Sequence, residues 1–146
     1  MATTDIVTAC VLIIGNEVLS GRTQDVNLKY LGENLNHIGI QICEARVVPD
    51  ITDEIVEALN ALRQRYDYVF TTGGIGPTHD DITSAAIAKA FGRKLTRHPE
   101  AEAILRAHYK PRDVTEARLK MSDLPEGATL IRSEERRVGK ECRSRW

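Results

Sequence analysis

The 146-residue sequence predicts an α/β fold: a three-layer α/β/α domain with a mainly parallel sheet. Three observations predict this class. Short, apolar, partly β-branched segments alternate with longer segments whose apolar residues recur at helical spacing. The connections between the strand-like segments are long enough to hold a crossover helix. Polar, glycine-containing segments directly follow the predicted strands, where α/β proteins place their binding sites.

The first predicted strand is Val7–Ile14, a continuous apolar run (VTACVLII) typical of a strand buried on both faces. A polar segment follows, and a helix is then predicted with Asp25 as its N-cap and Gly39 just beyond its end. The second strand starts at Ile40 and ends before Pro49-Asp50. The apolar residues of the helix are Val26, Leu28, Leu31, Leu35 and Ile38.

Thr52 is predicted to cap the next helix, whose apolar face holds Ile55, Leu59 and Leu62. The third strand, Tyr68–Thr71, leads directly into a glycine-rich loop. A helix of small residues (TSAAIAKAF) follows and ends at Gly92. The remaining elements are predicted as a helix over 99–109, a short helix over 113–121, a turn over 124–127 and a strand over 128–131.

The composition gives no sign of a nucleic-acid or membrane partner. The formal net charge is −1, so no strongly basic surface is expected. The three cysteines form no C-x-x-C pair, and the N-terminus has neither a basic leader nor an apolar run long enough to span a bilayer. We therefore expect a cytoplasmic protein with reduced thiols.

Charge is distributed unevenly along the chain. Residues 1–131 carry a net charge of −4, whereas residues 132–146 (RSEERRVGKECRSRW) carry +3 and show no apolar periodicity. A natural basic arm for a nucleic acid or an acidic partner is one interpretation of this tail. The interpretation we favour is a non-native terminus, so the predicted domain is 1–131.

Polar loops follow the first three strands, at 15–25, 49–52 and 73–83. Because parallel strands point the same way, these loops are expected to meet at one edge of the sheet. Gly73, Gly74 and Gly76 allow positive φ and close backbone approach, so the third loop (TTGGIGPTHDDIT, 71–83) is predicted to bind phosphate at a helix start. A simple tight turn is the alternative, because the spacing matches neither the P-loop nor G-x-G-x-x-G.

Asp80 and Asp81 add negative charge beside this predicted phosphate site. Two carboxylates would repel a phosphate unless a cation bridges them, and carboxylates with phosphate oxygens are the usual ligands of Mg²⁺. Asp81 is therefore predicted as a metal ligand or as a residue that organises charge at the site. Asp80 is predicted as a helix cap or a second ligand, and His79 as a residue of the rim. Asp50 is predicted to face the same site, with a turn before the next helix as the alternative.

With these residues assembled, the chain resembles the MoaB/Mog molybdopterin-binding domain family, and most closely its CinA-type branch (competence/damage-inducible protein A). The matching segments are GNEVLSGRTQDVN (15–27), VVPD (47–50), TTGGIGPTHDDIT (71–83) and RLKMSDLPEGATLI (118–131). The resemblance implies a MoaB/Mog-like fold, a homo-oligomer and a pocket for a phosphorylated pterin or nucleotide. The ligand-binding residues expected there are Gly15, Glu17, Ser20, Gly21, Thr72, Gly73, Gly74, Gly76, Pro77, Thr78 and Thr83.

The resemblance also implies chemistry at a phosphoanhydride. Mog-type members adenylylate molybdopterin with Mg²⁺-ATP, and two acids essential there match Asp50 and Asp81, the predicted catalytic residues. CinA-type domains are associated with metal-dependent hydrolysis of ADP-ribose. Three functions are therefore expected in this order: a metal-dependent pyrophosphatase, a molybdopterin adenylyltransferase, and a non-catalytic module for a phosphorylated ligand.

The chain departs from the family pattern after Ile131. There the family continues with an Asn-Pro and Gly-rich segment, and here the basic tail stands in its place. The resemblance therefore implies a domain that is incomplete at its C-terminal end.

Overall fold

The computed structural model describes residues 6–131 and the strand 143–145. The main sheet has three parallel strands in the order β2-β1-β3, with bounds Val7–Ile14 (β1), Ile40–Val48 (β2) and Tyr68–Thr72 (β3). The central strand β1 is apolar and buried from Ala9 to Ile14, where helices cover both faces of the sheet. On the edge strand β2, half-buried and exposed residues alternate up to the buried Val48.

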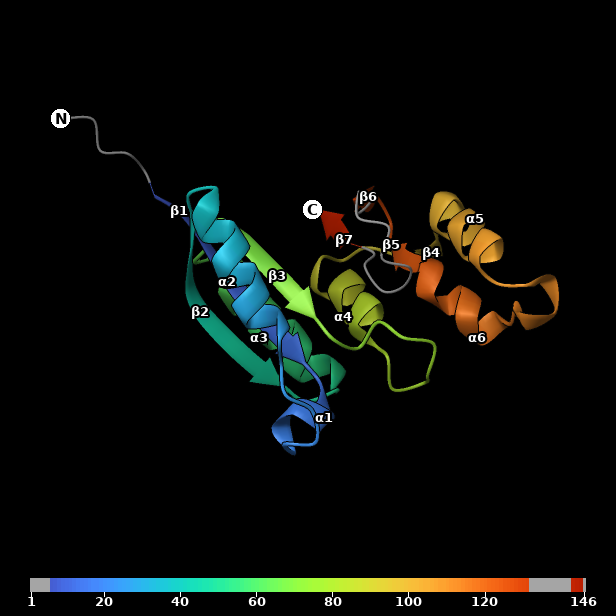
Figure 1. Ribbon diagram of the computed structural model, residues 1–146, viewed down its shortest axis with the longest axis horizontal. Helices are drawn as coiled ribbons and strands as arrows, with labels where there is room; N and C mark the ends of the chain where they lie inside the picture. The colour runs from blue at the N-terminus through green and yellow to red at the C-terminus, as the bar shows by residue number, and fades with distance from the viewer. Residues whose placement is uncertain (1–5, 132–142, 146) are drawn as a thin grey trace.

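Helices cover both faces of this sheet, which confirms the predicted three layers (Figure 1). Helix α2 (Asn27–His37) packs Leu31 and Leu35 against Val11 and Ile13 of β1. Helices α3 (Thr52–Arg63) and α4 (Thr83–Ala90) cover the opposite face. That second core contains Cys10, Leu12, Ile14, Val48, Ile55, Ala58, Leu59, Leu62, Ala86 and Ile87.

Residues 95–131, with the strand 143–145, form a smaller group of elements beside α4 (Figure 1). Its helices are α5 (Pro99–His108) and α6 (Glu116–Leu119), with single 3₁₀ turns η1 (Pro111–Asp113) and η2 (Lys120–Ser122). Two antiparallel pairs accompany them, β4 (Leu95–Arg97) with β5 (Asp123–Pro125) and β6 (Thr129–Ile131) with β7 (Arg143–Arg145). The sequence did not predict β4 and β5, since three residues are too few to show a period.

The predicted caps at Asp25 and Gly39 are right, and those at Thr52 and Asp80 are wrong. Asp25 accepts the backbone N–H of Leu28 at 2.9 Å and so caps α2, and Gly39 takes a φ of 80° just beyond it. Thr52 is not a cap but the first residue of α3, and its side chain makes no capping hydrogen bond. Asp80 does not cap α4 either, because α4 begins only at Thr83.

Within the described ranges 6–131 and 143–145, we find no helix long and apolar enough to cross a membrane. The interpretation of residues 132–146 as a non-native tail falls largely outside the described residues.

The two described cysteines differ in burial, and we expect them to differ in reactivity. Cys10 is fully buried in β1, and burial, with a smaller contribution from Glu44, raises the pKa of its thiol to about 11. Cys43 is exposed. Since the thiolate is the reactive form, we expect iodoacetamide to label Cys43 in the native protein at about pH 8 and to label Cys10 only after unfolding. Peptide mass spectrometry would measure both rates, and equal rates in the native state would contradict the buried position of Cys10.

Candidate functional site

The loops after β1, β2 and β3 lie at one edge of the sheet, as the sequence predicts. Figure 1 shows the carboxyl ends of β2 and β3 pointing toward the same side of the molecule as α1 (Asn16–Leu19), which directly follows β1. The three strands are parallel, and their carboxyl ends pair with one another, Ile14 with Val48 and Ile13 with Thr72, so these loops come together. We call this region the strand-end site, comprising residues 15–25, 49–52 and 72–83.

The first and second loops are joined by a pair of hydrogen bonds between Asn16 and Asp50. The backbone N–H of Asn16 donates to Asp50 Oδ2 at 2.9 Å, and the backbone N–H of Asp50 donates to Asn16 Oδ1 at 3.4 Å. The Asp50 carboxylate is therefore held by another loop rather than by its own turn. In the described chain its other oxygen, Oδ1, takes no hydrogen bond and lies 3.5 Å from the place of a Cβ built on Gly74.

The third loop turns through two glycines that no other residue could replace without strain. Gly73 and Gly74 have φ angles of 90° and 62°, in the left-handed region. A Cβ on Gly73 would overlap the carbonyl oxygen of Ile14, and a Cβ on Gly74 would overlap Thr83 Oγ1. Gly76 differs from the prediction: its φ is not positive, and what it permits is a close approach, since a Cβ there would lie 2.8 Å from Asp81 Oδ2.

Thr83 connects this loop to the start of α4. Its side chain is 1% exposed, its hydroxyl donates to the carbonyl of Gly73 at 2.8 Å, and its backbone N–H donates to the carbonyl of Gly74 at 3.1 Å. The side chain of Thr83 therefore ties the two ends of the loop together across ten residues. Thr83 was predicted as a ligand-binding residue; the structure places it behind the loop, where it sets the loop's shape.

Thr83→Val should loosen the loop while keeping the shape of the side chain. Loss of the buried hydrogen bond leaves the Gly73 carbonyl without that donor, and we expect the free energy of unfolding to fall by about 1–2 kcal/mol. Urea denaturation measures the change. Thr52→Val is the matched control, because Thr52 makes no capping hydrogen bond. A Thr83→Val protein as stable as the Thr52→Val protein would contradict this role.

Asp81 is fixed inside the third loop. Its Oδ2 accepts the backbone N–H of Thr78 at 2.9 Å and the hydroxyl of Thr78 at 2.6 Å. Partial burial opposes ionisation of this carboxyl, but the hydrogen bonds from Thr78 and Gly76 and the charge of Lys120 outweigh it, so its pKa lies below the ordinary 3.8. Asp81 is thus an oriented carboxylate at neutral pH, suited to holding a cation.

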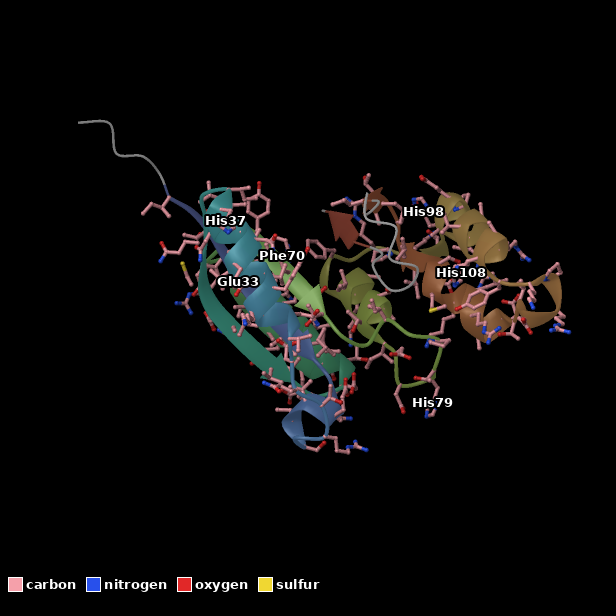
Figure 2. All side chains as sticks on the ribbon, in the orientation of Figure 1. Glu33, His37, Phe70, His79, His98 and His108 are labelled. Atoms are coloured by element: carbon pink, nitrogen blue, oxygen red, sulfur yellow. The ribbon has the colours of Figure 1, made fainter. Side chains whose placement is uncertain are left out.

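Asp80 and His79 turn outward at the tip of the same loop. Their side chains are 74% and 92% exposed, and His79 Nε2 lies 3.0 Å from Asp80 Oδ1. Figure 2 shows His79 at the outer end of this loop, far from His37 on α2 and from His98 and His108 on the α5 side. The structure therefore separates the two adjacent aspartates, and only Asp81 is held against the glycine loop.

The other predicted ligand residues are less tightly gathered. Glu17 lies in α1 with its carboxylate against Gly15, where a Cβ would lie 2.5 Å from Glu17 Oε1. Ser20 is exposed and hydrogen-bonds to the carbonyl of Glu17. Gly21 (φ 74°) and Pro77 are exposed at loop surfaces. Thr72 ends β3, and its buried hydroxyl has no hydrogen-bond partner among the described residues, so a ligand group could still satisfy it.

A divalent cation fits the donors present. Among the described residues no group of three or more His, Cys, Asp or Glu side chains could hold a metal ion. Mg²⁺, however, is commonly bound through one or two carboxylates plus the phosphate oxygens of a substrate. Asp50 and Asp81 supply such carboxylates, one close to Gly74 and the other close to Gly76, so the residues fit a cation that arrives with a phosphorylated ligand.

Lys120 is a site residue that the sequence analysis did not single out. From η2, its ammonium donates to the carbonyl of Thr78 at 2.8 Å and to the carbonyl of Asp81 at 2.9 Å. The sequence feature that could have indicated Lys120 is its position in the segment RLKMSDLPEGATLI, which matches the family. Its partners lie about forty residues away, and no local pattern reveals such a contact.

Comparison with known proteins identifies the family. Residues 10–133 match a family model described as "Probable molybdopterin binding domain". The chain belongs to this family. A CinA-like protein of Kosmotoga olearia is 37% identical over 123 residues, covering 83% of this chain and 30% of that protein. The chain spans about half the length, 46–49%, of curated archaeal relatives that it matches at 40–41% identity.

Solved structures agree with this membership. The structure of the CinA protein of Thermoplasma acidophilum, described as having unknown function, matches with a TM-score of 0.81 and 37% identity, covering 90% of this chain and 76% of that one. MoaB of Pyrococcus furiosus, described as a tungsten cofactor synthesizing protein, matches with a TM-score of 0.57 and 23% identity over 90% of this chain and 77% of that one, a likeness in fold alone. The molybdopterin-binding domain of this chain is therefore of the CinA-like type with a MoaB/Mog-like fold.

Proposed function

We propose that this protein is a metal-dependent pyrophosphatase that acts on ADP-ribose or a similar nucleotide diphosphate at the strand-end site. The observation that carries the proposal is the pair of carboxylates beside one glycine loop: Asp50 lies next to Gly74, and Asp81 lies next to Gly76. A phosphate bound by the loop would therefore have two carboxylates near it. Such a site suits a ligand with two linked phosphates and a bridging cation.

The residues have separate tasks in this reaction. Gly73 and Gly74 bring the backbone close to the phosphate, and Asp81, held by Thr78, binds the divalent cation. The cation would neutralise charge on the phosphate oxygens. Asp50 Oδ1 is available to accept a proton from the attacking water. Water oxygen bonds to one phosphorus, the anhydride P–O bond breaks, and ADP-ribose gives AMP and ribose 5-phosphate, with release of two protons when both monoesters are fully ionised.

Adenylyl transfer to molybdopterin is the second candidate. It is favoured by the family, since solved relatives of the same fold include cofactor-synthesis proteins named MoaB, and it would use the same two carboxylates. The attacking group would then be a pterin phosphate instead of water, displacing pyrophosphate from ATP. Binding of a phosphorylated ligand without turnover is the third candidate.

Product analysis separates these candidates. The purified protein is incubated with ADP-ribose and Mg²⁺ or Mn²⁺, and separately with molybdopterin and Mg²⁺-ATP, with EDTA as the control. AMP formed from ADP-ribose only with metal supports the proposal. Adenylylated pterin without AMP from ADP-ribose rejects it in favour of transfer, and ligand binding with no product favours the non-catalytic module.

A further inference from the structure

Lys120 brings a positive charge to the glycine loop, close enough to lower the pKa of the Asp81 carboxyl. It is half-buried, and it is the cationic side chain that donates hydrogen bonds to residues 73–83 in the described part of the chain. Lys120 lines a small hollow of about 30 Å³ together with Gly74, Gly76 and Asp81. It therefore reaches the loop on the side where Asp81 lies.

The ammonium group of Lys120 has one more donor than its partners use. A lysine ammonium carries three N–H groups, and the carbonyls of Thr78 and Asp81 take two of them in the described residues. These two bonds also fix where the charge stands. Among the described residues no third acceptor accompanies these two, so one N–H of the ammonium can turn to a ligand.

Charge balance indicates which acceptor that is. A phosphate placed on the loop would approach the carboxylates of Asp50 and Asp81, and one divalent cation offsets only those two charges. A ligand with two phosphates adds further negative charge, and an ammonium fixed at the loop lowers the cost of holding it. Lysine is a common phosphate-binding residue because it acts as a compact point charge.

We propose that Lys120 is a phosphate-binding residue of the strand-end site, holding the loop with two N–H groups and donating the third to a ligand phosphate. This inference rests on the proposed function, because it requires a phosphorylated ligand. It adds a residue from η2, outside the three strand-end loops. The competing explanation is that Lys120 only clamps the loop, and the experiment must separate charge from clamping.

Three variants make that separation. Lys120→Gln keeps an N–H donor for the loop carbonyls but removes the charge, Lys120→Arg keeps the charge, and Lys29→Gln on α2 is the matched control, since Lys29 is 82% exposed. Binding is measured with Mg²⁺ and α,β-methylene-ADP, whose P–C–P linkage resists hydrolysis. We expect Lys120→Gln to weaken binding about tenfold or more, the loss typical of a charged hydrogen bond. Lys120→Arg should stay within about threefold of wild type, and Lys29→Gln should be unchanged.

Steady-state kinetics of the variants and chemical labelling of the wild-type protein give two further tests. With ADP-ribose, Lys120→Gln should raise KM more than it lowers kcat, because the charge acts on bound phosphate. In the wild-type protein, α,β-methylene-ADP with Mg²⁺ should protect Lys120 from acetylation and leave Lys29 equally reactive. Protection remains informative even where a variant fails to fold.

The outcomes are distinct. Lys120→Gln with wild-type affinity for α,β-methylene-ADP would overturn the inference. Equal losses of affinity in the Gln and Arg variants, with a lower Tm and no ligand protection of Lys120, would also overturn it, because they would show that Lys120 only clamps the loop. A wild-type protein that binds α,β-methylene-ADP through Lys120 but hydrolyses no ADP-ribose would reject the pyrophosphatase and keep Lys120 as a phosphate ligand. A wild-type protein that binds neither α,β-methylene-ADP nor inorganic pyrophosphate would reject both.

Discussion

Replacing Asp81 by asparagine should reduce metal-dependent hydrolysis of ADP-ribose about a hundredfold or more. Asparagine can still accept the N–H and hydroxyl of Thr78, so the loop should keep its shape while losing the charge that binds the cation. Because the pKa of Asp81 lies below its ordinary 3.8, the carboxylate is ionised throughout the assay range. The defect should therefore be equally large at about pH 6 and about pH 8.

Initial rates at several Mg²⁺ concentrations measure this effect, with a thermal melt to show that the variant is folded. Glu33→Gln is the matched control: Glu33 lies on α2, its side chain is 63% exposed, and Figure 2 shows it away from the loop that carries His79. An Asp81→Asn protein with wild-type turnover would refute the assignment of Asp81 to the cation. Asp80→Asn discriminates further, because a loss as large as that of Asp81→Asn would mean that both carboxylates hold the metal.

The sequence could predict the strand-end site because its geometry follows from topology. Once Val7–Ile14 and its two neighbours are identified as parallel strands, Asp50 and the glycine loop must lie at the same edge. The positive φ angles of Gly73 and Gly74 were equally predictable, since consecutive glycines after a strand indicate a turn with left-handed backbone angles, which other residues rarely adopt.

Other features depend on contacts that local patterns do not reveal. Asp80 and Asp81 are identical residues at adjacent positions, and only Asp81 receives the hydrogen bonds of Thr78 that hold its carboxylate against the loop. Thr52 and Thr83 each stand at a helix start, yet only Thr83 finds a buried acceptor, because the loop folds back onto it. Lys120 reaches its site through tertiary packing alone.

Gly73→Ala should be the most destabilising single substitution at the strand-end site. Two costs combine: a non-glycine residue at a φ of 90° is strained, and its Cβ would overlap the backbone carbonyl of Ile14, which belongs to the buried central strand and cannot move aside. Together these should lower the free energy of unfolding by about 3 kcal/mol or more. At the size of this chain the Tm should fall by about 9 °C.

Gly92→Ala separates the two costs. Gly92 has a φ of 61°, also in the left-handed region, but a Cβ there would meet nothing within 4 Å. It should therefore show only the conformational cost, about 1 kcal/mol. The difference between the two variants in urea denaturation measures the overlap at Ile14, where the end of β1 lies against the glycine turn. Equal destabilisation would mean that β1 and the glycine loop are not in this close contact.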